Sequence, residues 1–466
     1  MKGKPLTRRA FMGHCAAGAA SVGAISRMDT VLARQRADLS DPTRISLIFA
    51  HPSSEGPCWP NIGYDFEGAK ADFLRRIRSS CPDIEFHPHT VMSEKDAAAV
   101  LASNDALDGY LLYMAGCLWG NVSESIAAAG KPVVYVDNLF AGSGEFLTSY
   151  ARIRRVGAPV IPVSSSRFED VADAVRCIDA VTKLRHSRAL VVGREPDHEI
   201  EKVYGTRMIA VPFDVISDAY HRSDEAEASA CAEKWIERAE KIIEPQAREI
   251  VKSARLYHAM RALLSEHGAQ AITVNCLGGF YGGHLPAYPC LGFMQLDDEG
   301  SVGACEADQR STLTKLLMRY LIDRPGFISD PVIDTAQNQI VYAHCVAPTR
   351  VFGPGGEASP YHLRDHSEDR KGACNRSLMP LGQTVTTMMF DHRKRQVILH
   401  QGCTKANLDI DRACRNKLAV EVQGDVYKLL NYWDEWGWHR VTFFGDFKRH
   451  VENVATLLGF EVVYEA

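Results

Sequence analysis

The sequence predicts an α/β protein in which two tandem doubly wound, Rossmann-like domains precede a C-terminal antiparallel β-barrel-like domain. Three observations lead to this fold class. Short apolar runs alternate with helix-like segments over residues 44–166, and the same pattern returns over residues 167–325. Over residues 326–466 the pattern changes to alternating, β-branched-rich runs with turn residues between them. A chain of 466 residues is also too long for one hydrophobic core.

The first unit begins with the apolar run RISLIFA, residues 44–50, which is typical of a buried strand. Residues 66–80 have the spacing of an amphipathic helix, and residues 109–116 and 131–138 are again continuous apolar runs. Buried runs separated by helices are typical of a parallel sheet that is covered on both faces. The run APVIPVSSS then closes the unit near residue 166.

The second unit repeats this order of elements. A helix is expected at residues 168–184, and strands are expected at residues 188–193, 207–213 and 271–279. The long charged region between them, residues 224–267, has helical character but contains Pro245. A proline inside a helix removes a hydrogen bond and clashes with the preceding turn. This region therefore predicts two helices or one kinked helix.

The C-terminal part has the pattern of antiparallel strands. Residues 338–347, 383–402 and 417–425 form alternating runs, and Phe390-Asp391-His392 has the character of a hairpin break. The last segment, residues 439–466, returns to strand, helix and strand. Together these runs indicate an antiparallel sheet or a small barrel.

The N-terminus, residues 1–34, has the layout of a twin-arginine export signal. It is basic, and Arg8-Arg9 precede an Ala/Gly-rich, weakly apolar stretch. Such a signal exports a folded protein to the periplasm, and the protein stays cytoplasmic if the signal does not function. The alternative is a disordered basic tail.

Composition excludes several classes of partner. The formal net charge of −5 gives no basic surface for nucleic acid or an anionic membrane. No apolar run outside the N-terminus approaches the roughly 18 residues of a membrane span. The 13 cysteines include no Cys-x-x-Cys pair, so they do not indicate a zinc ribbon or a thioredoxin-like site. Several lie in apolar runs, where we expect buried thiols: Cys117, Cys276, Cys290, Cys305 and Cys345.

Two carboxylates stand where a predicted strand is followed by a helix. The stretch VGACEAD places Glu306 and Asp308 directly before the helix-like QRSTLTKLLMRYLI. Acidic residues at a helix N-terminus are ordinary stabilising groups. The carboxyl end of a strand in an open α/β sheet is also where ligands bind. Both interpretations stay open at this point.

Two further side chains are candidate ligands for a divalent metal ion. Asp330 precedes Pro331 after an apolar turn, and His439 stands at the entry to a buried strand. Carboxylate and imidazole ligands with open positions suit Mn²⁺ or a related octahedral ion. Each residue also has a structural alternative, since Asp330 can cap a turn and His439 can be a core histidine.

The run VGACEADQRSTLTKLLMRYLIDRPGFISD resembles the L-fucose isomerase and L-arabinose isomerase superfamily, in which an ACE-x-D segment opens a helix and a second acid follows. The separation here, 330 − 306 = 24 residues, is similar to the fucose isomerase branch. The runs IVYAHCVAP and GWHRVTFFGD resemble later segments of that superfamily. The resemblance covers residues 265–466 well and is only architectural before them.

The resemblance implies a metal-dependent aldose–ketose isomerase that acts on a sugar substrate through an enediol. Glu306, Asp330 and His439 would bind the divalent ion, usually Mn²⁺, and Glu306 and Asp330 would also be the acid/base pair. Asn275 at a strand tip and His366 would bind the substrate. His344 would bind substrate or become a further metal ligand. The family assembles as trimers or hexamers whose sites are completed by a neighbour, so the resemblance also implies a homo-oligomer.

Two alternatives accompany this hypothesis. Two tandem α/β units with an export signal also describe an exported, non-catalytic sugar-binding protein. An enediolate site can also support epimerisation or an aldolase-type step. The chain departs from the family in two ways: it is shorter, and Trp438 and Arg440 flank the metal histidine. These departures affect the choice of sugar more than the metal site.

Overall fold

A computed structural model describes residues 41–103 and 106–466 of the chain. The predicted export signal, residues 1–34, lies outside these described residues. The chain forms two compact units by its internal contacts. We call residues 40–185 with 448–461 the N-terminal unit, and residues 186–447 with 462–466 the barrel unit. None of the helices in the described part of the chain is both long and apolar enough to cross a membrane.

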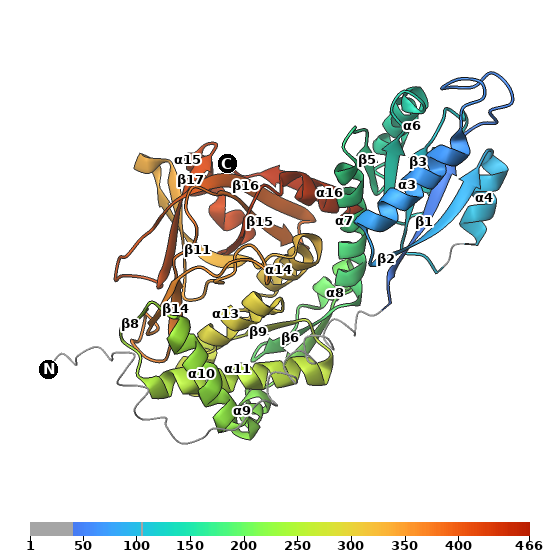
Figure 1. Ribbon diagram of the computed structural model, residues 1–466. Coiled ribbons are helices and arrows are strands. Elements are labelled where there is room, and N and C mark those ends of the chain that lie inside the picture. Colours follow the sequence, from blue (N-terminus) through green and yellow to red (C-terminus); the bar gives the residue numbers. More distant parts are fainter. Residues whose placement is uncertain (1–40, 104–105) are drawn as a thin grey trace. The chain divides into compact units, whose positions relative to one another are not determined.

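The N-terminal unit contains a parallel sheet of five strands in the order β2-β1-β3-β4-β5 (Figure 1). This order, with helices between successive strands, is a doubly wound arrangement. Its strands are β1 (Thr43–Ala50), β2 (Ile84–Val91), β3 (Gly109–Met114), β4 (Val133–Asp137) and β5 (Val160–Val163). Its helices are α3 (Phe66–Ser80), α4 (Glu94–Ala102), α5 (Val122–Ala127), α6 (Ser143–Arg155), α7 (Phe168–His186) and α16 (Lys448–Leu458).

Strand β2 has no counterpart among the strands that the sequence predicts. It contains Pro88 between two histidines, and proline is depleted from central strands because it cannot donate a ladder hydrogen bond. The structure places β2 at the edge of the sheet, beside β1 only. An edge strand tolerates proline. Pro88 therefore made the strand hard to predict from the sequence, and it is compatible with the edge position that the structure shows.

The barrel unit begins with a second parallel sheet, in the order β10-β9-β6-β7. Helices pack on both of its faces, and α9, α10 and α11 lie together (Figure 1). The strands are β6 (Arg188–Val192), β7 (Arg207–Val211), β9 (Ala271–Val274) and β10 (Val302–Ala304). The helices are α8 (His198–Tyr204), α9 (Phe213–Arg222), α10 (Glu225–Arg238), α11 (Ala247–His267), α12 (Cys276–Tyr281), α13 (Cys290–Glu299) and α14 (Gln309–Ile322). The charged region around Pro245 is thus two helices, α10 and α11.

Six antiparallel strands then close into a barrel. Their order is β15-β18-β11-β12-β17-β16, and β16 pairs again with β15. Together with the two parallel sheets, this barrel confirms the predicted fold class. The strands are β11 (Phe327–Asp334), β12 (Gln339–His344), β15 (Thr384–Asp391), β16 (Gln396–Asn407), β17 (Asn416–Gln423) and β18 (Arg440–Phe444).

Smaller elements complete this unit. β19 (Glu461–Tyr464) adds to the barrel beside β16. β8 (Lys241–Ile242), β13 (Tyr361–Arg364) and β14 (Cys374–Ser377) form a separate three-stranded sheet. The short helices are η1 (Thr335–Gln337), α15 (Val426–Tyr432) and η2 (Trp433–Trp436).

The hairpin between β15 and β16 turns later than the sequence predicts. The expected break at Phe390-Asp391-His392 is still strand as far as Asp391, and residues 392–395 form the turn. The carboxylate of Asp391 accepts hydrogen bonds from the amides of Arg393 and Lys394, at 2.9 and 3.0 Å. Asp391 therefore initiates the turn instead of lying inside it.

A buried ion pair holds the end of the chain to the barrel. Arg440 has no exposed side-chain surface, and its Nη2 donates to Glu465 at 3.1 Å. Glu465 also lies 2.7 Å from Nδ1 of His400. The remaining donors of Arg440 reach the carbonyls of Trp433, Gly437 and His439 at 2.9 to 3.0 Å. All these groups are withdrawn from water, so each depends on the others for its hydrogen bonds.

We expect Glu465→Gln to destabilise the barrel unit by about 3–5 kcal/mol, because the guanidinium of Arg440 would keep its charge in a dry site without a counter-charge. Urea denaturation followed by circular dichroism measures this change. The matched control is Glu421→Gln on β17, whose ion pair with Lys405 is about half exposed. That change should cost about 1 kcal/mol or less. Equal losses in both variants would contradict the role of the buried pair.

Candidate metal centre

Neighbouring strands of the barrel bring three candidate residues together by register. In the antiparallel ladder of β11 and β18, Ser329 pairs with Arg440, so Asp330 lies beside the entry of His439. In the ladder of β11 and β12, Asp330 pairs with Ala343, the residue before His344. Asp330, His344 and His439 therefore come from consecutive strands of one barrel edge.

The fourth residue, Glu306, comes from the end of the second parallel sheet. It follows β10 and stands three residues before the first residue of α14. Glu306 and Ala307 both have left-handed backbone conformations, with φ of 63° and 49°. Such conformations cost about 1–3 kcal/mol each for residues other than glycine, and they gather at functional sites. The two residues turn the chain so that Glu306 faces the histidines and Asp308 becomes the N-cap of α14.

The four side chains form a compact group. Nε2 of His439 lies 3.2 Å from Oδ1 of Asp330 and 3.6 Å from Oε2 of Glu306. Nε2 of His344 lies 3.8 Å from the other oxygen of Glu306. Ligand atoms on an octahedral ion with bonds of about 2.1 Å stand about 3 Å apart. The observed separations are slightly larger and are therefore close to those of a metal site.

The ring and backbone of His439 are each held by other residues. Nδ1 of His439 donates to Oδ2 of Asp308 at 2.9 Å, which fixes the ring and leaves Nε2 for a ligand. Arg440 donates to the carbonyl of His439 at 3.0 Å. Gly437, with φ of 84°, precedes this segment, and a Cβ there would clash with the guanidinium of Arg310.

Two buried nitrogens provide the test of whether these residues fit a metal ion. Among the residues that the structure describes, Nε2 of His344 and Nε2 of His439 are buried and have no hydrogen-bond partner. A buried polar atom without a partner is costly, so such atoms indicate a missing group. The atoms of Glu306, His344 and His439 lie within 4.8 Å of one another. Their chemistry, carboxylate oxygen with imidazole nitrogen, fits a divalent ion.

The pKa values of the two carboxyl groups in the site are shifted in opposite directions. Burial raises the pKa of Glu306. Burial would also raise the pKa of Asp330, but the neighbouring imidazoles of His439 and His344 bring it below its usual value. Burial alone would lower the pKa of His439, and the carboxylates of Asp308 and Asp330 instead raise it to about 10. A surplus of negative charge therefore surrounds the imidazole of His439, which is the condition that attracts a cation.

Two other predicted residues have different surroundings. Asn275 is the N-cap of α12, where its side chain accepts from the amide of Gly278 and donates to the carbonyl of Gly193. His366 packs against the rings of Phe280 and Tyr288, with ring centroids 5.6 and 5.5 Å away. Their predicted contacts with substrate stay predictions.

The tryptophans of the segment before β18 divide into two kinds. Trp433 and Trp436 are buried. Trp438 is 65% exposed although it directly precedes His439. An interaction with its indole also helps to lower the pKa of Asp330, after the larger effects of the imidazoles. An exposed aromatic ring therefore borders the group of candidate ligands.

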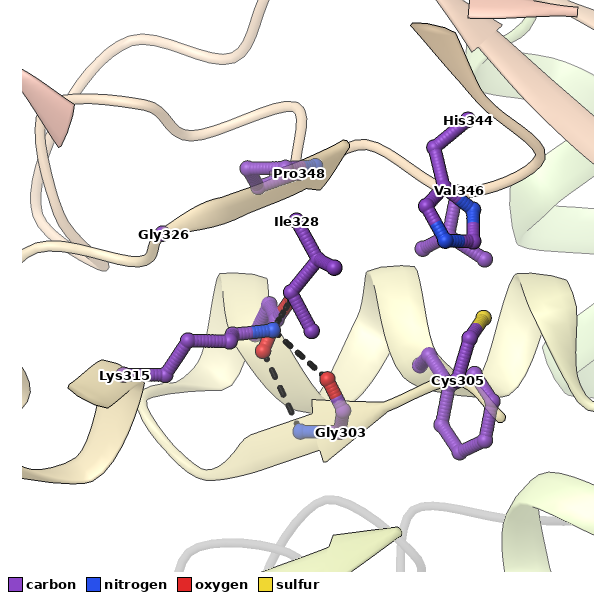
Figure 2. Close-up of a pocket in the computed structure, with 10 residues that line it drawn as sticks. Gly303, Cys305, Lys315, Gly326, Ile328, His344, Val346 and Pro348 are labelled. Atoms are coloured by element: carbon purple, nitrogen blue, oxygen red, sulfur yellow. Dashed lines mark hydrogen bonds and ion pairs between the residues drawn. The ribbon is translucent and has the colours of Figure 1, made fainter. Parts of the chain in front are cut away.

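A pocket with an empty volume of about 240 Å³, open to solvent in part, lies beside this group and is lined by Cys305, His344 and Lys315 (Figure 2). Nζ of Lys315 donates to Asp297 at 2.7 Å and to the carbonyl of Gly303 at 2.6 Å. The buried carboxylate of Asp297 accepts from the amide of Gly303 at 3.2 Å. These bonds anchor β10, the strand that leads to Glu306.

The fold and the site together define an α/β and barrel protein with a carboxylate–imidazole group suited to a divalent ion. No protein-family model matches the chain. It is similar to a sulfoquinovose isomerase of Alkalicoccus urumqiensis, 25% identical over 203 residues, which are 40% of this chain and 44% of that protein. It is also similar to a sulfoquinovose isomerase of Clostridium sp. (strain MSTE9), 25% identical over 154 residues, which are 33% of this chain and 34% of that protein.

The matched segments thus span less than half the length of these relatives. Both relatives carry the name of a sugar isomerase. This agrees in reaction class with the resemblance drawn from the ACEAD segment. The closer relation to L-fucose isomerase stays a prediction.

Sequence reasoning did not assign Asp308 to the site. Its carboxylate caps α14 by accepting from the amides of Arg310 and Ser311, both at 3.1 Å, and also accepts from His439. The capping interpretation of ACEAD thus applies to Asp308, while Glu306 faces the histidines. The signal for this division was present in the sequence, because only the acid next to the helix can be its N-cap.

We expect Asp308→Asn to lower the pKa of His439 from about 10 toward its usual value in metal-free protein, because the ring loses its nearest negative charge. Asparagine caps helices as well as aspartate does, so α14 should persist. NMR titration of the histidine ring protons measures the change. The control is Asp224→Asn, where the same two capping bonds exist at α10. An unchanged titration of His439 would contradict the assigned contact.

Proposed function

We propose that this chain is a metal-dependent sugar isomerase that interconverts an aldose and a ketose through an enediol. The observation that carries the proposal is the buried Nε2 of His439, which lies 3.6 Å from the carboxylate of Glu306 and 3.2 Å from that of Asp330. The similarity to two sulfoquinovose isomerases supports the reaction class.

Glu306, Asp330 and His439 would hold the ion, and Mn²⁺ suits this oxygen-rich set. When bound, such an ion polarises a sugar carbonyl and stabilises negative charge on adjacent sugar oxygens. The chain's own contribution is to fix the three ligands in advance. Asp308 orients the ring of His439, and the barrel register sets Asp330 beside it.

Isomerisation of an open-chain sugar requires one group to take a proton from carbon and one to return a proton to the neighbouring carbon. Burial raises the pKa of Glu306, whereas that of Asp330 lies below its usual value because of the imidazoles beside it. Carboxyl groups whose pKa values differ in this way are suited to opposite roles. We therefore propose Glu306 and Asp330 together as the acid/base pair of the reaction.

The sugar would lie against residues around this pair. The exposed ring of Trp438 borders Asp330 and offers an apolar surface to the carbon-bound hydrogens of a sugar. His344, whose ring centre is 5.4 Å from that of His439, would contact a sugar oxygen. His366 and Asn275 stay as further candidates. Sulfoquinovose, the sugar in the names of both relatives, is the first substrate to test, followed by unsubstituted aldoses and ketoses.

We also propose a homo-oligomer, as the family resemblance implies. Its physical support is a group of exposed aromatic residues in the N-terminal unit. Trp59, Trp119 and Phe140 are 58%, 65% and 86% exposed, and Nε1 of Trp59 donates to the carbonyl of Phe140 at 2.7 Å. All three follow strands of the parallel sheet at its carboxyl edge. Exposed aromatic surface of this kind is typical of an interface with another chain.

Export to the periplasm is a further proposal. It rests on Arg8-Arg9 and the weakly apolar stretch that follows them. A protein whose signal does not function would stay in the cytoplasm.

We expect Glu306→Gln to lower isomerase activity by at least about 100-fold, because it removes a group that holds both the ion and a proton. The measurement is turnover of sulfoquinovose and of simple aldoses with Mn²⁺, beside the metal content of each sample. The control is Glu357→Gln, which changes an exposed glutamate on a loop. A fully active Glu306→Gln protein, or a wild type that binds sugar without turnover, would contradict the proposal.

We expect the wild type to sediment as a trimer or hexamer, and the double variant Trp119→Ser, Phe140→Ser to shift toward the monomer. Sedimentation equilibrium measures both. Leu430→Ser, which changes an exposed apolar residue on α15, is the control and should leave the assembly unchanged. A monomeric wild type would overturn the proposed assembly.

A further inference from the structure

A group of buried thiols adjoins the candidate metal ligands in the sequence and in space. Cys305 and Cys345 are the chain neighbours of Glu306 and His344, and both are buried. Their sulfurs are 3.9 Å apart. Sγ of Cys345 also lies 3.3 Å from Nδ1 of His344. The thiol of Cys290 and the imidazole of His366 also interact with Cys345. One sulfur is therefore surrounded by two thiols and two imidazoles.

The separations in this group match those of ligands on a tetrahedral ion. Two thiolates bound at about 2.3 Å in tetrahedral geometry stand about 3.8 Å apart, close to the 3.9 Å between Cys305 and Cys345. A sulfur and a nitrogen on the same ion stand about 3.5 Å apart, close to the 3.3 Å between Cys345 and His344. The ligand atoms of all three residues lie within 4.8 Å of one another.

The chemistry of the group differs from that of the site in front of it. Thiolates select thiophilic ions such as Zn²⁺ or Cu⁺, whereas carboxylates select Mn²⁺.

Two members of this group also line the pocket described above. Cys305 and His344 both line the pocket above Lys315, and Figure 2 shows the thiol of Cys305 directed toward the side of the pocket where the His344 ring lies. Nδ1 of His344 accepts the amide of Cys345 at 2.8 Å, a bond that an ion on Nδ1 would replace.

We propose that Cys305, Cys345 and Nδ1 of His344 form a second metal site, for a thiophilic ion of the Zn²⁺ type. Binding forms metal–sulfur bonds and releases the thiol protons to solvent. With Nδ1 on this ion, Nε2 of His344 carries a proton and faces Glu306, 3.8 Å away. The thiol site and the carboxylate site would thus be coupled through one imidazole.

Co²⁺ is the probe that separates the two sites. Reduced, metal-free protein is titrated with Co²⁺, and we expect the near-ultraviolet absorption that only thiolate-to-cobalt charge transfer gives. Cys305→Ser and Cys345→Ser should each lose at least half of it. Cys231→Ser, a buried thiol of α10 outside the group, should keep all of it.

The outcome is independent of the proposed isomerase. Glu306→Gln should keep the thiolate absorption, because the thiol ligands do not include Glu306. No such absorption in the wild type at saturating Co²⁺ would overturn the second site, even if the protein binds one Co²⁺ and isomerises sugars. Full absorption in the Cys305→Ser, Cys345→Ser double variant would overturn it equally. Urea denaturation of each variant verifies that it is folded.

Discussion

The position of the site depends on one buried guanidinium. Arg440 has no exposed side-chain surface, and its charge is balanced by Glu465 near the end of the chain. The same group binds the carbonyls of Trp433, Gly437 and His439, so it fixes the segment that enters β18. A buried ion pair of this kind fixes one conformation of the chain more than it adds to the free energy of unfolding. It therefore helps to fix the backbone that carries His439.

The second fixed point is the junction of β10 with α14. Asp308 serves the helix and the histidine at once, because one carboxylate accepts from two helix amides and from Nδ1 of His439. The left-handed residues Glu306 and Ala307 precede it and store backbone strain. The burial of β10 and the hydrogen bonds of Asp308 offset that strain. A parallel sheet and an antiparallel barrel thereby contribute to one small group of ligands.

Much of the fold follows from the residue pattern, since continuous apolar runs and amphipathic helices indicate parallel sheets regardless of tertiary detail. Strand β2 could not be predicted in this way, because Pro88 is compatible only with an edge position, which the sequence does not disclose. The grouping of Glu306, Asp330, His344 and His439 depends on strand register between distant segments. The residue pattern alone does not fix that register. The expectation that these residues form one site came from the resemblance of the motifs to a known superfamily. The thiols were expected to be buried, but their mutual distances are a tertiary property.

Helix α16 is synthesised long after the rest of the unit to which it belongs. It packs on β5 of the N-terminal unit, and its His450 lies 3.7 Å from Asp173 of α7. A ribosome makes this helix more than 250 residues after the rest of that unit, since residues 186–447 come between. The apolar surface that α16 covers must therefore stay uncovered while the barrel unit emerges. We expect chaperones to bind this uncovered surface, and the N-terminal unit is complete only when α16 has been synthesised.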